Sequence, residues 1–256
     1  MKTLLTISYK ESAQVLRSQR GLLWLLSFSG LLSAFSLLLV SNTELSLLDN
    51  AQVVYMMSGT VVAAGALLAA ILGSDAYAGE KERGTLVPLL CTPISANILL
   101  TGKALGMLIA WGIMFIVATP YLWAVGASGQ NLAAASIYLV LCGTPVVLGF
   151  GFLAMALSAR TGSVLASLLS STTLLMLAAS PLLIGPGLRG TAIGRCLDAI
   201  NPMAGALNTF DSVIIDSEPF SAQMARLLLV AAWFGLCLVA ARRSAANLHF
   251  YKGKIS

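Results

Sequence analysis

The sequence contains few charged residues and a single histidine. Of its 256 residues, 10% are Asp, Glu, Lys or Arg. A soluble globular domain carries about 25% charged residues, so the composition excludes a soluble domain of this size. Apolar residues take the place of charge, because 58% of the chain is hydrophobic and the mean hydropathy is +0.89. This composition is typical of an integral membrane protein.

The sequence also lacks the alternating apolar and polar residues of an outer-membrane β-barrel. It contains unbroken apolar stretches instead, and a helix needs about 20 apolar residues to cross a hydrocarbon core about 30 Å thick. Helices satisfy their own backbone hydrogen bonds within lipid. The predicted fold class is therefore an all-α membrane protein with six transmembrane helices. The predicted spans are Gly21–Val40, Val53–Leu72, Ala104–Val125, Leu132–Leu157, Val164–Ile184 and Arg226–Ala241.

Lysine and arginine lie mostly on one side of the predicted membrane. If the N-terminus is cytoplasmic, three of the 15 basic residues lie outside, namely Arg189, Arg195 and Arg226, and the other twelve lie in cytoplasmic segments. Cytoplasmic segments carry the excess of Lys and Arg, so we expect both termini in the cytoplasm. The basic residues are dispersed, so the net charge of +5 indicates contact with membrane lipid and not with nucleic acid.

Cysteine and histidine are placed where they predict no disulfide, metal or cofactor site in this chain. Cys91 is expected in the cytoplasm, Cys142 and Cys237 inside spans, and Cys196 outside, so no two meet in an oxidising compartment. The chain has no Cys-x-x-Cys pair, and His249 is its sole histidine, which argues against a zinc site.

Two segments outside the spans are predicted to be helical. Residues 1–20 form a basic segment that we expect to lie as a helix along the inner leaflet, the alternative being an irregular basic tail. The six-span domain occupies residues 21–256. Its outer segment 185–223 carries two apolar patterns at helical spacing on either side of Asn201-Pro202. These predict short interfacial or re-entrant helices, which form either an external gate or docking surface, or a lid that closes the bundle.

The longest predicted cytoplasmic connection, residues 73–103, combines charge with an apolar stripe. Asp75, Glu80, Lys81, Glu82 and Arg83 precede the stripe, and Leu86, Leu89 and Leu90 share one helical face within it. A short amphipathic helix of this kind can insert its leucines into a groove on a soluble partner, while the charged neighbours set the register. The alternative, a basic tether that fixes topology, explains the basic residues but not the leucines.

The same connection resembles that of the ABC-2 type permeases, the six-span membrane subunits of ATP-driven exporters. The resemblance depends on Glu82-Arg83-Gly84-Thr85-Leu86, on Leu89-Leu90-Cys91-Thr92-Pro93-Ile94-Ser95 and on Gly102-Lys103, together with the six-span order. Val87-Pro88 departs from the usual pattern. The resemblance implies that Glu80, Glu82, Arg83, Gly84 and Thr85 dock on a separate nucleotide-binding ATPase subunit, which would bind ATP and Mg²⁺. It also implies a second permease chain, identical or similar, with the substrate path between the two. The expected location is the bacterial cytoplasmic (inner) membrane.

Three other functional classes were weighed against this interpretation. Gly79 and Gly84 have P-loop spacing, but Thr85 stands where the lysine is required. Ser128 lies in a Gly-x-Ser-Gly sequence as in rhomboid proteases, yet His249 is expected a bilayer's thickness away. Ion-coupled transport usually needs an ionisable group within the membrane, and the middles of the predicted spans contain none.

The sequence leaves the transported substance open. Uncharged spans suit a lipid, a lipid-linked glycan or an amphiphilic drug. The complex could alternatively move no solute and transmit ATP-driven motion to an extracytoplasmic partner, as in metalloenzyme maturation or surface assembly.

Overall fold

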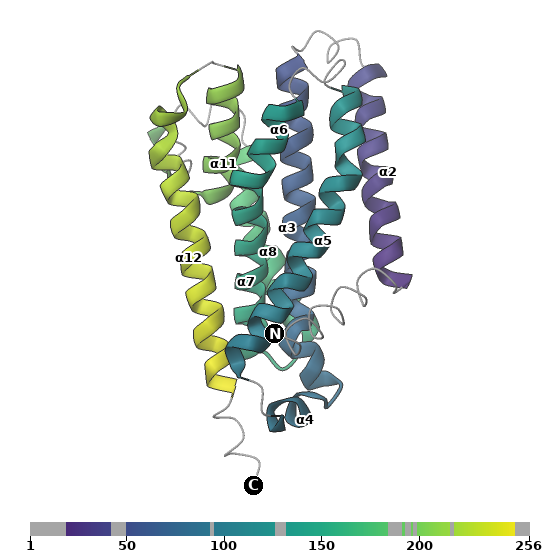
Figure 1. The fold of residues 1–256 in the computed structure, drawn as a ribbon, viewed down its shortest axis with the longest axis vertical. Helices are drawn as coiled ribbons and strands as arrows, with labels where there is room; N and C mark the ends of the chain where they lie inside the picture. The colour runs from purple at the N-terminus through teal and green to yellow at the C-terminus, as the bar shows by residue number, and fades with distance from the viewer. Residues whose placement is uncertain are drawn as a thin grey trace.

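The computed structural model describes residues 19–41, 50–92, 95–125, 132–183, 191–192, 196, 199–215 and 218–248. Across these ranges the chain is helical and contains no strand, which confirms the all-α class (Figure 1). The predicted helix at 1–20 lies almost wholly outside the described residues, as do Ser128 and His249. The elements are α2 (Gln19–Ser41), α3 (Asn50–Glu82), α4 (Leu86–Cys91), α5 (Ala96–Val125), α6 (Leu132–Tyr138), η2 (Leu139–Gly143), α7 (Thr144–Arg160), α8 (Val164–Leu183), α11 (Pro202–Phe210), η3 (Asp211–Ile215), η4 (Phe220–Gln223) and α12 (Met224–Asn247).

Each predicted span corresponds to a helix or to a continuous run of helices. Among the described residues, five stretches are long and apolar enough to cross a membrane, whereas the described apolar part of α8, Val164–Ala179, is shorter. Five of the six predicted spans are therefore confirmed as helices long and apolar enough to cross a membrane. Two helices are longer than predicted, because α3 continues from Leu72 to Glu82 and α5 begins at Ala96. The connection between them accordingly shortens from residues 73–103 to residues 83–95.

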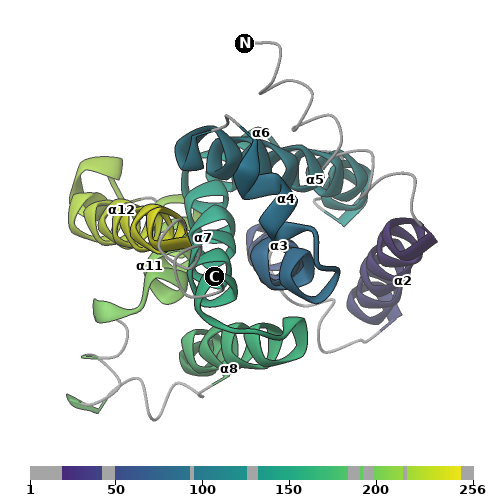
Figure 2. The ribbon, with the colours of Figure 1, turned by 90° about the horizontal axis from the view of Figure 1, so that it is seen from below.

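Helix α3 lies at the centre of the bundle, with α2, α5, α7 and α8 around it (Figure 2). Its closest approach is to α7, where a Cβ atom on Gly73 would overlap the carbonyl oxygen of Gly151 and lie 2.8 Å from the Cβ of Ala154. Small residues let membrane helices pack at such short separations. Displacement of the α3 end is therefore opposed by a close backbone contact with α7.

The fourth span contains a π-helical turn, η2, between α6 and α7. Pro145 follows it within the first turn of α7 and has no backbone N–H to donate. The Thr144 hydroxyl donates to the Leu139 carbonyl at 3.2 Å, and the Trp111 indole donates to the same hydroxyl at 2.9 Å. The local change in helix geometry is thus held by a hydrogen bond from α5, the neighbouring span.

Helix α11 lies at the end of the bundle away from α4 (Figure 1). Almost all of its residues are buried, including Met203, Leu207 and Phe210, and it packs against α12 and α8. Asn201 caps its first turn by accepting from the Met203 amide at 2.9 Å, and the Asn201 side-chain amide donates to the Ala178 carbonyl of α8. Helix α11 is too short to span the membrane and is covered by protein. Such cover is what a re-entrant helix requires within the bilayer.

Candidate functional site

The end of α3 is closed by a glycine-dependent turn. Gly84 has a φ of +69°, which strongly favours glycine because other residues meet a steric penalty there. The Thr85 amide donates to the Glu80 carbonyl at 2.9 Å and the Gly84 amide to the Lys81 carbonyl at 3.0 Å. These two bonds form a Schellman motif, which ends a helix and turns the chain sharply. Gly84 thereby directs the chain into α4.

Glu80 and Lys103 form a buried ion pair that joins α3 to α5. Lys103 Nζ lies 3.6 Å from Glu80 Oε1, and the two side chains are 5% and 12% exposed for Lys103 and Glu80 respectively. The Thr85 hydroxyl donates to Glu80 Oε2 at 2.5 Å. Buried charges require such partners because removing them from water costs several kcal/mol per ion. Glu80 therefore faces the inside of this chain, where it holds the turn against α5, and the docking role implied for it stays a prediction.

Lys81 and Glu82 each form hydrogen bonds with backbone groups at the end of another helix. Lys81 Nζ donates to the carbonyl oxygens of Ala159 and Thr161, at 2.7 Å each, at the C-terminal end of α7. Glu82 Oε1 accepts from the Val164 amide at 2.8 Å, at the N-terminus of α8. A cation at a helix C-terminus and an anion at an N-terminus both complement the helix dipole. The end of α3 is thus connected to α7 and to α8 by charge-assisted hydrogen bonds.

Ser158 of α7 provides a further connection, one turn deeper. Its hydroxyl donates to the Ser74 carbonyl at 2.7 Å and accepts from the amides of Ala78, at 2.7 Å, and Tyr77, at 3.0 Å. Ser74 carbonyl and Ala78 amide are the pair that closes one turn of a regular helix, so the serine binds within the hydrogen-bond ladder of α3. The hydroxyl is fully buried.

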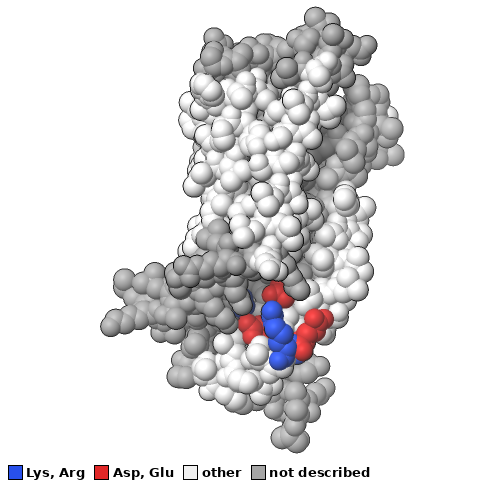
Figure 3. Space-filling view, turned by 90° about the vertical axis from the view of Figure 1, so that its right-hand side faces the viewer, with Lys and Arg blue, Asp and Glu red and all other residues white. Residues whose placement is uncertain are grey.

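A surface patch of charge lies at the α4 end of the molecule. In Figure 3 the charged side chains on this face gather at that end, and the described surface above them is uncharged. Arg83 Nη2 donates to Asp75 Oδ2 at 2.8 Å, with both side chains about half exposed. Gly79 lies between them, and a Cβ atom there would overlap the Asp75 carboxylate. Glu82, Arg83, Gly84 and Thr85 are all exposed, so these four predicted residues can meet a partner.

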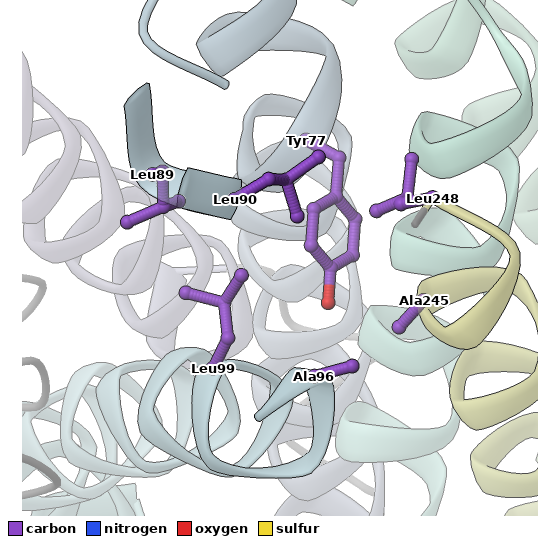
Figure 4. A pocket seen from close by; sticks show the side chains of 7 residues that line it. All are labelled: Tyr77, Leu89, Leu90, Ala96, Leu99, Ala245 and Leu248. Carbon is purple, nitrogen blue, oxygen red and sulfur yellow. The ribbon is translucent and has the colours of Figure 1, made fainter. Parts of the chain in front are cut away.

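Helix α4 forms where the leucine spacing predicted a helix, but its leucines face inward. Leu86 is buried, and Leu89 and Leu90 pack beside Tyr77 of α3, with Leu99 of α5 completing the group (Figure 4). The cavity left among these side chains and the end of α12 is only about 10 Å³. Leu86 therefore holds α4 against its own bundle, whereas Leu89 and Leu90 are half-buried, and the expectation that they anchor in a partner's groove stays a prediction.

The exposed side of α4 is made by other residues. Val87, Pro88, Cys91 and Thr92 are exposed, with Val87 at 54%. Pro88 lies in the first turn of α4, where a missing backbone N–H leaves no intrahelical bond unmade. The departure at Val87-Pro88 therefore leaves the helix intact and sets its outward surface.

The structure brings the predicted residues together at one junction and adds others to it. Thr85 contacts Glu80, and Glu82 contacts the start of α8, whereas Lys103 and Ser158 were not predicted as partners. Lys103 had a signal in the sequence, because it is a lone charge followed by a long apolar run. Ser158 had none beyond its small size. Gly79 lies inside α3, so the glycine pair 79 and 84 does not form the strand-to-helix loop of a P-loop.

The comparisons with known proteins identify the family of the chain. The family model described as "ABC-2 family transporter protein" matches residues 5–243, nearly the whole chain. No curated protein matches the sequence. Because the match covers nearly the whole chain, it depends on the sequence of all the spans and not on one motif. The chain therefore belongs to the ABC-2 family of transporter proteins and is a membrane-spanning permease subunit of an ABC transporter.

Proposed function

We propose that this permease exports an apolar or amphiphilic substrate, using ATP hydrolysis by a separate ATPase subunit that docks on the α4 end. The docking surface is formed by the exposed residues of the turn after α3, Glu82 to Thr85, and by the outward side of α4. The α4 end is cytoplasmic in this proposal, because the excess of Lys and Arg lies in the segments on that side. A second copy of the chain completes the membrane unit, and the substrate path lies between the two.

One observation carries the proposal: the end of α3 is tied to three other helices. Lys103 connects it to α5, the carbonyls bound by Lys81 belong to the end of α7, and Glu82 binds the first amide of α8. A loop that only links two spans has no need of these bonds. If a partner displaces α4, these bonds would move the connected ends of α5, α7 and α8 with the end of α3. Such a joint movement is needed to change the opening of the bundle.

The docking surface can be tested by one substitution and a matched control. Val87 is exposed and lies on the outward side of α4. Val87→Asp places a charge in the proposed interface, and an interface hot spot of this kind is worth about 2 kcal/mol or more, which is about thirtyfold in affinity. Val87→Thr keeps the shape and adds no charge, so it serves as the control.

The measurement is co-purification of the tagged chain from its native membrane. An ATPase subunit should accompany the wild type and Val87→Thr, and its yield should fall at least tenfold with Val87→Asp. Membrane insertion is measured in the same samples by the yield of the tagged chain. Recovery of the wild type without any nucleotide-binding subunit, under conditions that preserve membrane complexes, would refute the proposal.

A second candidate function, transmission of motion to an extracytoplasmic partner, is favoured by how α8 is held. Glu82 accepts from the Val164 amide, the first amide of α8. The Asn201 side chain at the start of α11 donates to the Ala178 carbonyl near the other end of α8. Arg226 of α12 holds the far end of α11 by donating to the Asn208 carbonyl at 3.1 Å and to the Ser212 hydroxyl at 2.9 Å. A shift of α8 would therefore reach α11. The same co-purification distinguishes this candidate, which requires an external protein in the complex.

A further inference from the structure

A large cavity opens beside the end of α3 and borders the outward side of α4, with which it shares Val87. Its volume is about 610 Å³, and its walls come from the end of α3, from α4, from the turn between α7 and α8, and from the end of α12. This size suits a small organic ligand or part of a lipid.

The charge in the cavity wall is positive. Lys81 and Arg160 line it, and among the described residues no Asp or Glu does. Lys81 Nζ already donates to the carbonyls at the end of α7, so it supplies charge and few free donors. Arg160 is exposed and forms no ion pair with any described residue. Its guanidinium can therefore offer a planar pair of donors to a phosphate.

The remaining wall is largely apolar and lies at the edge of the membrane. Leu86, Val87 and Leu248 contribute apolar surface, and Leu90 adds to it. The α12 wall comes just after the exposed pair Arg242-Arg243, which follows the apolar part of the helix. Such a pair marks the depth of the lipid headgroups. The cavity therefore combines cations with apolar surface next to the level of the lipid headgroups, where a phospholipid has its phosphate.

We propose that this cavity binds an anionic phospholipid of the inner leaflet, with its phosphate on the Arg160 guanidinium and its glycerol and upper acyl region along Leu86, Val87 and Leu248. The assignment of the leaflet rests on the orientation given under Proposed function. Basic pockets between helices on the cytoplasmic side are the sites where anionic headgroups bind membrane proteins. A lipid held there would contact α4, α7 and α12 at once and would make the junction sensitive to membrane composition.

The test measures lipid retention by the purified chain alone. The protein is reconstituted with equal amounts of phosphatidylglycerol and phosphatidylcholine, extracted in mild detergent, and its bound lipid is counted by native mass spectrometry. The wild type should retain phosphatidylglycerol preferentially. Arg160→Gln should reduce the preference about fivefold, the usual effect of one basic residue at an anionic surface. Arg243→Gln removes an exposed arginine at similar depth outside the cavity and should leave the preference unchanged.

A second pair of variants separates the cavity from the charge. A Cβ atom on Gly162, in the cavity wall, would meet nothing within 4 Å, so the Gly162→Leu side chain starts from an open position and takes up part of the cavity. It should abolish retention of either lipid, whereas Gly235→Leu, at an equally open position on α12, should not.

Three results would overturn the proposal. One is equal retention of the two lipids by the wild type, and another is competition by inorganic phosphate with no lipid retained, which would indicate a soluble anion site. The third is unchanged lipid retention in Gly162→Leu together with loss of the ATPase subunit, which would assign the cavity to the protein interface. Lipid retention is measured without the ATPase, so its failure would leave the proposed coupling untouched, and a failure of coupling would leave the lipid result standing.

Discussion

Removal of the Ser158 hydroxyl should weaken the joint between α3 and α7. The hydroxyl makes three buried hydrogen bonds, one to a carbonyl and two from amides, all to the Ser74–Ala78 turn. Interhelical hydrogen bonds in membrane bundles average about 0.6 kcal/mol each, with a maximum of about 1.7. Three such bonds give about 2 kcal/mol, so we expect Ser158→Ala to lower the free energy of unfolding by about that amount.

The assay is reversible unfolding in mixed micelles, followed by tryptophan fluorescence, with hydrogen exchange as a local readout. The amides of Tyr77 and Ala78 should exchange faster in Ser158→Ala, because each loses an acceptor. Ser170→Ala is the matched control, since the Ser170 hydroxyl is exposed and donates at 2.8 Å within its own helix to the Ala166 carbonyl. The control should change stability by less than about 0.5 kcal/mol. An equally small change in Ser158→Ala, with unchanged exchange of the two amides, would refute the role given to this serine.

Three further predictions concern the same end of the bundle and its orientation. Lys103→Met leaves the buried Glu80 carboxylate without its ammonium partner and should lower the free energy of unfolding by about 3–5 kcal/mol. Most of this loss should be recovered in the double variant that also carries Glu80→Gln. Gly73→Ala should cost about 1–3 kcal/mol because a backbone carbonyl faces it, whereas Gly112→Ala, where a Cβ atom meets open space, should not destabilise the fold in the same denaturation assay. A membrane-impermeant maleimide applied to intact spheroplasts should label the exposed Cys196 and reach the exposed Cys91 only after permeabilisation, and the opposite pattern would invert the topology.

Sequence reasoning located the helices well because apolar length is the dominant signal in a membrane. It ended the second span at Leu72 and began the third at Ala104, since charges start at Asp75 and end at Lys103. The helices continue through these charges because Glu80 and Lys103 neutralise each other inside the protein. Hydropathy reports where a chain can enter lipid and does not report where a helix ends.

The sequence predicted where the short helix α4 lies, but not which neighbours its side chains contact. Helical spacing showed that Leu86, Leu89 and Leu90 share a face, yet spacing cannot tell whether a partner or the chain's own core covers that face. The positive φ of Gly84 follows from its place after a charged helix end, a recognisable sequence signal. The contact of Ser158 with α3 depends on tertiary packing alone, and so no local pattern could indicate it.

The central claim is that the outward side of α4 meets an ATPase subunit, and Cys91 offers the most direct test because its thiol is exposed on that helix. With Cys196 replaced by serine, a benzophenone maleimide attached to Cys91 in permeabilised native membranes should, on illumination, form a covalent adduct with a nucleotide-binding ATPase. A chain that carries Cys196 and has Cys91→Ser should form none. An ATPase adduct from Cys196 in place of Cys91, or no ATPase adduct from either position, would contradict the account.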